Sequence, residues 1–388
     1  MVCARNLASP FLAAFLALSA LAFTGSVAGA QADDTVRIGL EAPLSGDQAT
    51  IGKGMLKGAK LAAKQLNAGD GIGGKKVEIV PIDDAADPET GVEAATAAIA
   101  EGLDGVVGPY NSGVGAETLP LYIEAGLVPI RLTSADATAG LGFTLQPMTS
   151  QIAPVASEAL TTWLGARSVA IAYDPTTLYT ESVSTALKQL LEQAGVAITA
   201  YEPVEPGRRD YTDLVEKLDA TNPDVIYVAT YFPEGGLIAK AMRSIPSQAQ
   251  CIADYGSYDT GFITVAGLKA ARTCPVVGVP SPGEFPGSER LVAEYRKQFG
   301  SAPGTWSPYA FDSVNLLADA AEEAGGFDAA ALTDALNQVN GWEGWTGSVA
   351  IEPGTGNREP ATVVVIQTSG NGRFRLLTDW ARAVGYKT

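Results

Sequence analysis

From Thr35 onward, short apolar runs alternate with segments of helical periodicity, and this alternation is the feature that most restricts the fold. VRIGLEAPL (36–44) and KVEIVPIDD (76–84) are typical of strands, and apolar residues recur at spacings of three and four between them. Each strand–helix–strand unit is right-handed and lays its helix on a face of a parallel sheet. An α/β fold with helices on both faces is therefore expected.

The same plan begins again at about residue 150. Strands are predicted at 168–174, 197–204, 224–232 and 251–256, with helices between them. A chain of 388 residues that is 46 % hydrophobic is long and apolar enough for two cores. Two doubly wound parallel-sheet lobes are predicted.

Residues 1–30 have the pattern of a secretory signal peptide. Arg5 precedes an apolar run over 11–23, and Ala28-Gly29-Ala30 is a small-residue cleavage site. The run is short for a membrane anchor, which is the alternative. We expect cleavage near Ala30 and a mature protein free in the periplasm, without membrane insertion. Cys3 would leave with the leader, and no cysteine directly follows the run for a lipid anchor.

Composition argues against several functions. The formal net charge of -17 disfavours nucleic acid and anionic membrane. The chain has no histidine, which removes the commonest general base and zinc ligand. Asp83-Asp84 could do acid–base chemistry but follow a strand as loop carboxylates do, and GIGG (71–74) precedes a strand and is a turn, not a phosphate loop. No catalytic residue, metal or cofactor is predicted.

Two cysteines remain in the mature chain. Cys251 and Cys274 each lie on or beside a predicted strand, in a compartment that permits oxidation. A disulfide and two buried free thiols are both open.

The stretch DGVVGPYNSGVG (104–115) is a buried strand that runs into a glycine-rich turn and a helix. Asn111 and Ser112 fall where that helix begins, and its free N–H groups favour a carboxylate or polar ligand. A helix cap without ligand is the alternative. Ser134-Ala135-Asp136 follows a later strand, so both loops are expected at the rim where α/β sheets bind ligands.

The strands of the second series end in aromatic residues. We expect Tyr179, the pair Tyr231-Phe232 and Tyr255 at this second rim. Each is a ligand contact or a core side chain.

The order of these motifs resembles the branched-chain amino-acid (Leu/Ile/Val) binding family, periplasmic solute-binding proteins of ABC importers with the type I fold. The resemblance covers essentially the whole mature chain. It rests on IGLEAPLSG, KGAKLAAKQLNAGDGIGGKKVEIVPIDDAADP, GVVGPYNSG, DYTDLVEKL with NPDVIYVATYFPE, and FDSVNLLADA.

The resemblance implies two lobes joined by a three-segment hinge, with crossings near 149–152, 279–283 and 350–353. The lobes would comprise 34–150 with 282–350, and 151–281 with 351–388.

The resemblance also assigns ligand contacts. Ser112 matches a serine that holds the ligand carboxylate, and Ser134-Ala135-Asp136 matches a Ser-Ala-Thr turn that holds carboxylate and ammonium. Tyr179 matches the aromatic of an Asp-x-x-x-Tyr-Gly turn, with one residue more, and Tyr231-Phe232 matches a Tyr-Tyr pair.

Two positions depart from the family pattern. Asp136 stands where threonine is usual, and Tyr255 replaces the glutamate that neutralises an amino acid's ammonium. Asp136 could take over that role. Otherwise the ligand would be a carboxylate, amide or aromatic compound, with Arg131 either supplying charge or held in a surface salt bridge.

The resemblance implies a monomeric receptor that captures a small organic solute, an amino acid or related carboxylate or amide, and delivers it to the membrane permease of an ABC importer. A ligand sensor of the same fold coupled to a signalling partner is the alternative. We expect Ser112→Ala to weaken binding without lowering the melting temperature.

Overall fold

The computed structural model describes residues 35–387, so the predicted signal peptide lies outside the described residues. Two sheets organise this part of the chain. The chain passes between them three times, after β5, after β10 and after β13. Two mostly parallel α/β lobes with three connecting segments confirm the predicted fold class.

The first sheet has the strand order β11-β12-β13-β5-β4-β3-β1-β2. The strands β1 to β5 are parallel. From late in the chain, β13 joins β5 in parallel, and β11, β12 and β13 pair with one another antiparallel. Their bounds are β1 Thr35–Ala42, β2 Lys76–Asp83, β3 Gly105–Val107, β4 Pro129–Arg131, β5 Phe143–Thr144, β11 Asn340–Gly344, β12 Gly347–Glu352 and β13 Asn357–Arg358.

The second sheet has the order β15-β14-β10-β9-β8-β6-β7. Its centre is apolar and buried on both faces, as β8 shows by having every residue buried. The bounds are β6 Ser168–Tyr173, β7 Ala197–Pro203, β8 Val225–Ala229, β9 Gln250–Ala253, β10 Val276–Gly278, β14 Val364–Thr368 and β15 Phe374–Leu376.

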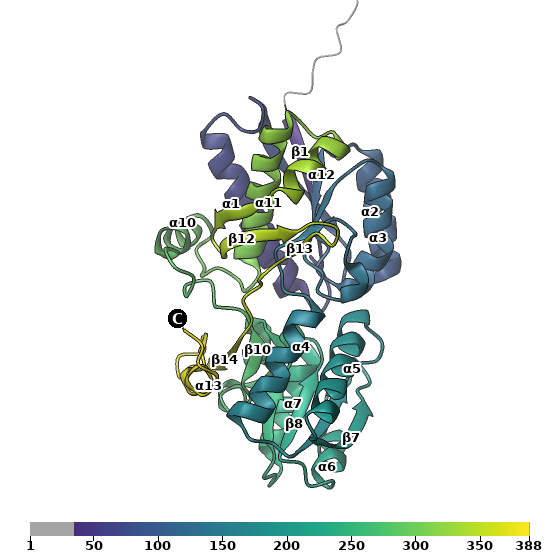
Figure 1. The fold of residues 1–388 in the computed structure, drawn as a ribbon, viewed down its shortest axis with the longest axis vertical. Helices are drawn as coiled ribbons and strands as arrows, with labels where there is room; N and C mark the ends of the chain where they lie inside the picture. Colours follow the sequence, from purple (N-terminus) through teal and green to yellow (C-terminus); the bar gives the residue numbers. More distant parts are fainter. Residues whose placement is uncertain (1–34, 388) are drawn as a thin grey trace, which may run out of the picture. The chain divides into compact units, whose positions relative to one another are not determined.

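Helices cover the faces of both sheets (Figure 1). In the first lobe α1 packs against α11 and α2 against α3; in the second α4 packs against α5, and α7 against α6 and α8. The bounds are α1 Ala49–Ala68, α2 Pro88–Ala100, α3 Ser112–Glu124, α4 Thr149–Glu158, α5 Leu178–Gln193, α6 Thr212–Asp219, α7 Phe232–Ser244, α8 Thr260–Ala266, α9 Leu268–Ala271, α10 Glu289–Phe299, α11 Ser307–Ala324, α12 Ala329–Asn337 and α13 Thr378–Val384.

Local signals set several boundaries. The Asp87 side chain caps α2 by accepting from the backbone N–H of Thr90 at 2.9 Å, and Pro88 occupies the first helical position.

The third passage between the sheets comes later than the expected 350–353. The strands β12 and β13 still belong to the first sheet, and the chain enters the second sheet at Val364.

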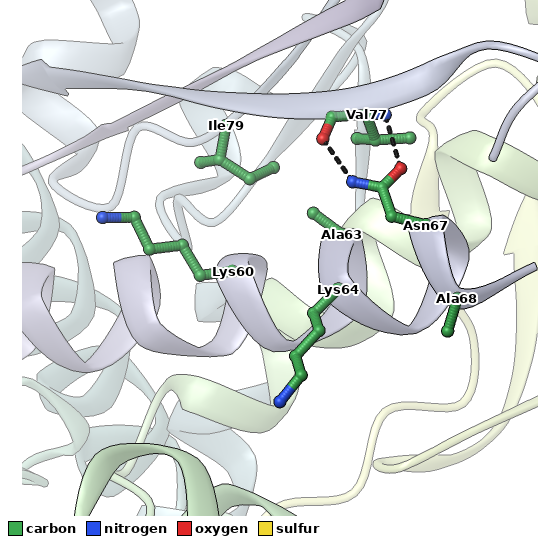
Figure 2. Close-up of a pocket in the computed structure, with 7 residues that line it drawn as sticks. All are labelled: Lys60, Ala63, Lys64, Asn67, Ala68, Val77 and Ile79. Carbon is green, nitrogen blue, oxygen red and sulfur yellow. Dashed lines mark hydrogen bonds between the residues drawn. The ribbon is translucent and has the colours of Figure 1, made fainter.

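A side chain of α1 makes hydrogen bonds to the free edge of β2, the last strand of the first sheet. Asn67 donates from Nδ2 to the carbonyl of Val77 at 2.8 Å and accepts from its N–H at 2.7 Å (Figure 2). An edge strand leaves such groups free to pair with another chain. The amide thus completes both hydrogen bonds where the sheet has no further strand.

A disulfide ties β9 to the segment before β10. Cys251 and Cys274 are bonded to each other and both are buried. The crosslink joins two neighbouring parts of the second sheet, since β9 and β10 are paired.

Candidate functional site

The turn between β3 and α3 places Tyr110, Asn111 and Ser112 at the carboxyl end of the first sheet. Gly108 makes this turn with a φ of 103°, a conformation that favours glycine. A Cβ there would collide with the backbone of Glu41. Gly113 and Gly115 lie within α3 instead, so only Gly108 serves the expected sharp bend.

Ser112 connects this turn with the next rim loop. Its Oγ accepts from the backbone N–H of Ser134 at 3.2 Å and of Ala135 at 3.0 Å, and all three residues are buried. Because the oxygen already accepts two hydrogen bonds, the hydroxyl group can still donate its proton to a further partner. The two predicted polar loops therefore form one unit.

Gln146 extends this unit to the second lobe. It follows β5, where the chain first leaves the first sheet, and its side chain is fully buried. Its Oε1 accepts from Ser134 Oγ at 3.2 Å and from the Tyr255 hydroxyl at 3.1 Å. Hydrogen bonds thus run without a break from Ser112 through Ser134 and Gln146 to Tyr255.

Five aromatic rings form a closed circuit beside this chain of hydrogen bonds. Successive ring centroids are between 5.2 and 6.3 Å apart in the order Tyr110, Tyr231, Tyr179, Tyr255, Trp306 and back to Tyr110. Tyr110 and Trp306 belong to elements of the first lobe, and the other three belong to the second. We call these five residues the aromatic circuit; both lobes contribute to it.

Asp254 supports the circuit from the second lobe. Its carboxylate accepts from the Tyr179 hydroxyl at 2.8 Å, the Tyr227 hydroxyl at 2.6 Å and the backbone N–H of Gly256 at 3.1 Å. Burial raises the pKa of Asp254 and raises those of Tyr179 and Tyr227 well above the usual value for a phenol. Asp254 therefore fixes the position of Tyr179 and has little capacity left for a ligand cation.

Three buried polar atoms at this place have no hydrogen-bond partner within residues 35–387. They are Asn111 Oδ1, Gln146 Nε2 and Trp306 Nε1. Asn111 uses only its Nδ2, which donates to Gln48 Oε1 at 3.0 Å. A buried polar group without a partner costs about 1–3 kcal/mol. One acceptor and two donors are thus unused where both lobes meet.

Two predicted contacts lie apart from this group. Asp136 is exposed, and its Oδ1 accepts from the N–H and hydroxyl of Ser150 at the start of α4. Phe232 begins α7 and packs against Gly261 of α8. The structure therefore brings together Asn111, Ser112, Ser134, Ala135, Tyr179, Tyr231 and Tyr255, without Asp136 or Phe232.

The expectation that Arg131 is held in a surface salt bridge is wrong. Its side chain is fully buried, and the guanidinium donates to Asn357 Oδ1 at 2.6 Å and to the carbonyl of Thr355 at 3.4 Å. Burial lowers its pKa to about 9. Arg131 thus joins β4 to β13 and to the turn that precedes β13, and it takes part in no salt bridge among residues 35–387.

Sequence reasoning missed Tyr110, Gln146, Asp254 and Trp306. Tyr110 lies inside the GPYNSG motif, and Asp254 directly precedes Tyr255. Their closeness in sequence to predicted contacts could have identified both as site residues. Gln146 follows a strand of two residues, which leaves no local pattern. Trp306 precedes Ser307-Pro308 at the start of α11, a helix start of the kind proline marks.

Two cavities lie apart from the hydrogen-bond chain and the aromatic circuit. A depression of about 500 Å³ lies between α1 and β2, lined by Lys60, Lys64 and Asn67 among others (Figure 2). A second cavity, of about 780 Å³, lies beside the connecting segments and includes Phe285, Arg358 and Tyr386. We call this second one the hinge cavity.

The described part of the chain contains no group of three or more residues suited to hold a metal ion. Within the same residues, no helix combines the length and apolar character needed to cross a membrane.

Two α/β lobes that meet at the carboxyl ends of their strands, in a buried polar and aromatic group, have the architecture of proteins that bind small molecules between lobes. The chain matches the family model described as periplasmic binding protein over residues 35–372. A Leu/Ile/Val-binding protein homolog 1 of Brucella melitensis is 31% identical over 323 residues, covering 82% of this chain and 85% of the relative. The chain belongs to the periplasmic binding protein family.

Solved structures agree on the fold. The leucine-binding protein LivK of Thermotoga maritima has a TM-score of 0.82 and 21% identity, over 88% of this chain and 97% of its own. A solute-binding protein of an ABC transporter from Rhodopseudomonas palustris, solved with 3,4-dihydroxybenzoic acid, has a TM-score of 0.78 and 21% identity, over 88% and 96%.

Proposed function

We propose that the protein captures a small organic solute between its two lobes in the periplasm and delivers it to the membrane permease of an ABC importer. Family membership supports this role, and the predicted signal peptide, cleaved near Ala30, supports the location. Binding needs only paired hydrogen bonds and apolar cover, without a catalytic group.

One observation carries the proposal: the hydrogen-bond chain from Ser112 to Tyr255, with the aromatic circuit beside it. Ser112 and Ser134 belong to the first lobe and Tyr255 to the second, so a solute held by all three needs both lobes. We propose Asn111, Ser112, Ser134, Ala135, Tyr179, Tyr231 and Tyr255 as ligand contacts, with Tyr110, Gln146 and Trp306 added.

We propose that the ligand is a small carboxylate or amide without an α-ammonium group and with an apolar or aromatic body. The donors available to it are the Ser112 hydroxyl, Gln146 Nε2, Trp306 Nε1 and the amino end of α3, which favours an anion. Neither Asp254 nor Asp136 is well placed to neutralise an α-ammonium group, because Asp254 already accepts three hydrogen bonds and Asp136 is exposed. The Rhodopseudomonas palustris protein solved with a dihydroxybenzoate supports an aromatic carboxylate.

We also propose a division of the chain into two lobes. Sheet membership supports 35–144 with 279–358 as one lobe and 149–278 with 364–387 as the other, since β13 pairs with β5 and β14 pairs with β10.

A thermal-shift screen of amino acids, amides and aromatic acids tests the ligand class. A solute that binds only the folded state raises the melting temperature. We expect 4-hydroxybenzoate and related acids to raise it more than leucine does. A larger shift with leucine would contradict the assignment of the class, and no shift with any of them would contradict the binding role.

A further inference from the structure

Gln146 lies where three parts of the molecule meet. Its backbone follows β5 in the first connecting segment, and the amide N–H donates to Thr144 Oγ1 at 3.1 Å. Its side chain has no exposed surface. Ser134 reaches it from the first lobe and Tyr255 from the second. A single atom, Oε1 of Gln146, thus accepts hydrogen bonds from both lobes.

The two ends of its side-chain amide are used unequally. Oε1 accepts from both hydroxyl groups, which fills the two lone pairs of a carbonyl oxygen. Nε2 can donate two hydrogen bonds, yet it has no partner among the residues that the structure describes. A buried donor in that state lowers stability by about 1–3 kcal/mol.

We infer that Gln146 is a specificity-determining residue that couples ligand recognition to lobe closure. Its Nε2 donates to a carboxylate or carbonyl oxygen of the solute, while its Oε1 holds Ser134 and Tyr255 together. The inference rests on the proposed function, and it assigns to one side chain the choice of ligands that carry an acceptor.

The consequence for conformation follows from the bond to Tyr255. Lobe opening separates Ser134 of the first lobe from Tyr255 of the second, so Oε1 of Gln146, which lies in the connecting segment, must lose at least one of its two hydrogen bonds. A solute bound to Nε2 fixes the orientation of the amide and so stabilises the closed form over the open one. A ligand without an acceptor at that place would bind without favouring closure.

Three variants separate the two ends of the amide. Gln146→Glu keeps an oxygen for Ser134 and Tyr255 but replaces the donor with a second acceptor. Gln146→Ala removes both Oε1 and Nε2, and Tyr255→Phe removes only the hydrogen bond from the Tyr255 hydroxyl to Gln146. Gln338→Glu is the matched control, since Gln338 is the exposed residue directly after α12 and its side chain donates to the backbone carbonyl of Asp334 at 3.2 Å.

The probes are 4-hydroxybenzoate and leucine, titrated by calorimetry, with circular dichroism to check folding. For 4-hydroxybenzoate we expect a roughly 10–100-fold loss of affinity in Gln146→Glu and Gln146→Ala, and a smaller loss in Tyr255→Phe. The Gln338→Glu variant should bind as the wild type does. Small-angle scattering should show Tyr255→Phe more open than the wild type at the same probe concentration.

Two results would overturn the inference and can be told apart. Wild-type affinity in folded Gln146→Glu would exclude a donor role for Nε2 and leave the transport role intact. Binding of neither probe by the wild type would contradict the proposed ligand class and this inference with it. If Gln146→Glu does not fold, Tyr255→Phe decides: unchanged affinity and unchanged scattering would reject the coupling.

Discussion

At the scale of single residues, Ser112 has a double role. The sequence predicted a ligand-binding hydroxyl, and the structure adds that the same oxygen accepts from two backbone N–H groups of the neighbouring loop. Removal of the oxygen would leave both donors buried and unpaired. The expectation that Ser112→Ala leaves stability unchanged is therefore revised.

We predict that Ser112→Ala lowers both affinity and stability. Loss of the hydroxyl donor should weaken binding of 4-hydroxybenzoate by roughly 1–3 kcal/mol, and loss of the acceptor should lower the free energy of unfolding by a similar amount. Calorimetry and urea unfolding measure the two effects. The exposed Ser301→Ala is the control. An unchanged free energy of unfolding would show that the contacts of Ser112 contribute no net stability.

A buried carboxyl pair lies beneath the same helix. Glu41 of β1 accepts from Thr118 Oγ1 of α3 at 3.1 Å, and burial, followed by the charge of Asp84, raises its pKa well above the usual value. Burial raises the pKa of Asp84 to about 7. Tyr122 of α3 and Asp83 also face the pair. Folding therefore retains protons on Glu41 and Asp84 that the unfolded chain releases near pH 4.

We predict that stability falls as the pH rises from about 5 to 8. A raised pKa in the folded state contributes stability below the unfolded pKa, and that contribution is lost as the pH passes the folded pKa. Buried Asp259 and Asp312, each with a pKa of about 6, act in the same direction. Urea unfolding at pH 5 and pH 8 measures the change.

Glu41→Gln tests the role of the pair. The variant should show a smaller loss of stability between pH 5 and 8 than the wild type, because glutamine does not titrate. Glu323→Gln, at an exposed position of α11, should keep the full loss. An equal loss in both variants would remove Glu41 from the explanation.

At the scale of elements, local sequence patterns predicted the central strands and most helices. The strand β3 lies in the 104–115 stretch that was predicted as strand, turn and helix, and α2 begins directly after the capping residue Asp87. These elements carry their own capping and periodicity signals. By contrast, β5 and β13 have two residues each and pair with one another through Thr144 and Asn357. A pairing across so great a separation leaves no local pattern, which is why the rim position of Gln146 was missed.

The residues of the candidate site also differ in whether a local sequence pattern predicts their position. Ser112 and Ser134 end predicted strands or begin predicted helices, so their rim position could be derived. The side-chain direction of Phe232 could not, because α7 begins at that residue and turns its ring toward Gly261. Tyr231, one residue earlier, joins the aromatic circuit.

The disulfide is an element-scale crosslink whose effect can be measured. Cys251 and Cys274 are 23 residues apart, and closing a loop of this length stabilises a fold by about 3 kcal/mol in the chain-entropy treatment. We predict a loss of that order in the free energy of unfolding of a Cys251→Ala, Cys274→Ala double variant, measured with urea. The wild type under reducing conditions should lose a similar amount. A loss below about 0.5 kcal/mol in both would show that neighbouring strand pairing already restrains this loop.

At the scale of the whole molecule, the chain passes three times between the two sheets, and the proposed site lies where the two lobes are in contact. Polar groups of the first rim and aromatic rings of the second are in direct contact at that site. A solute that binds there contacts both lobes and so favours the form in which they are together.

A crystal structure grown with the solute that gives the largest thermal shift is the most direct test of this arrangement. We expect its electron density within hydrogen-bond distance of the Ser112 hydroxyl and Gln146 Nε2, with its apolar body against Tyr255 and Trp306. Density in the hinge cavity, with the contacts between Gln146 and Tyr255 unchanged, would contradict binding between the two rims.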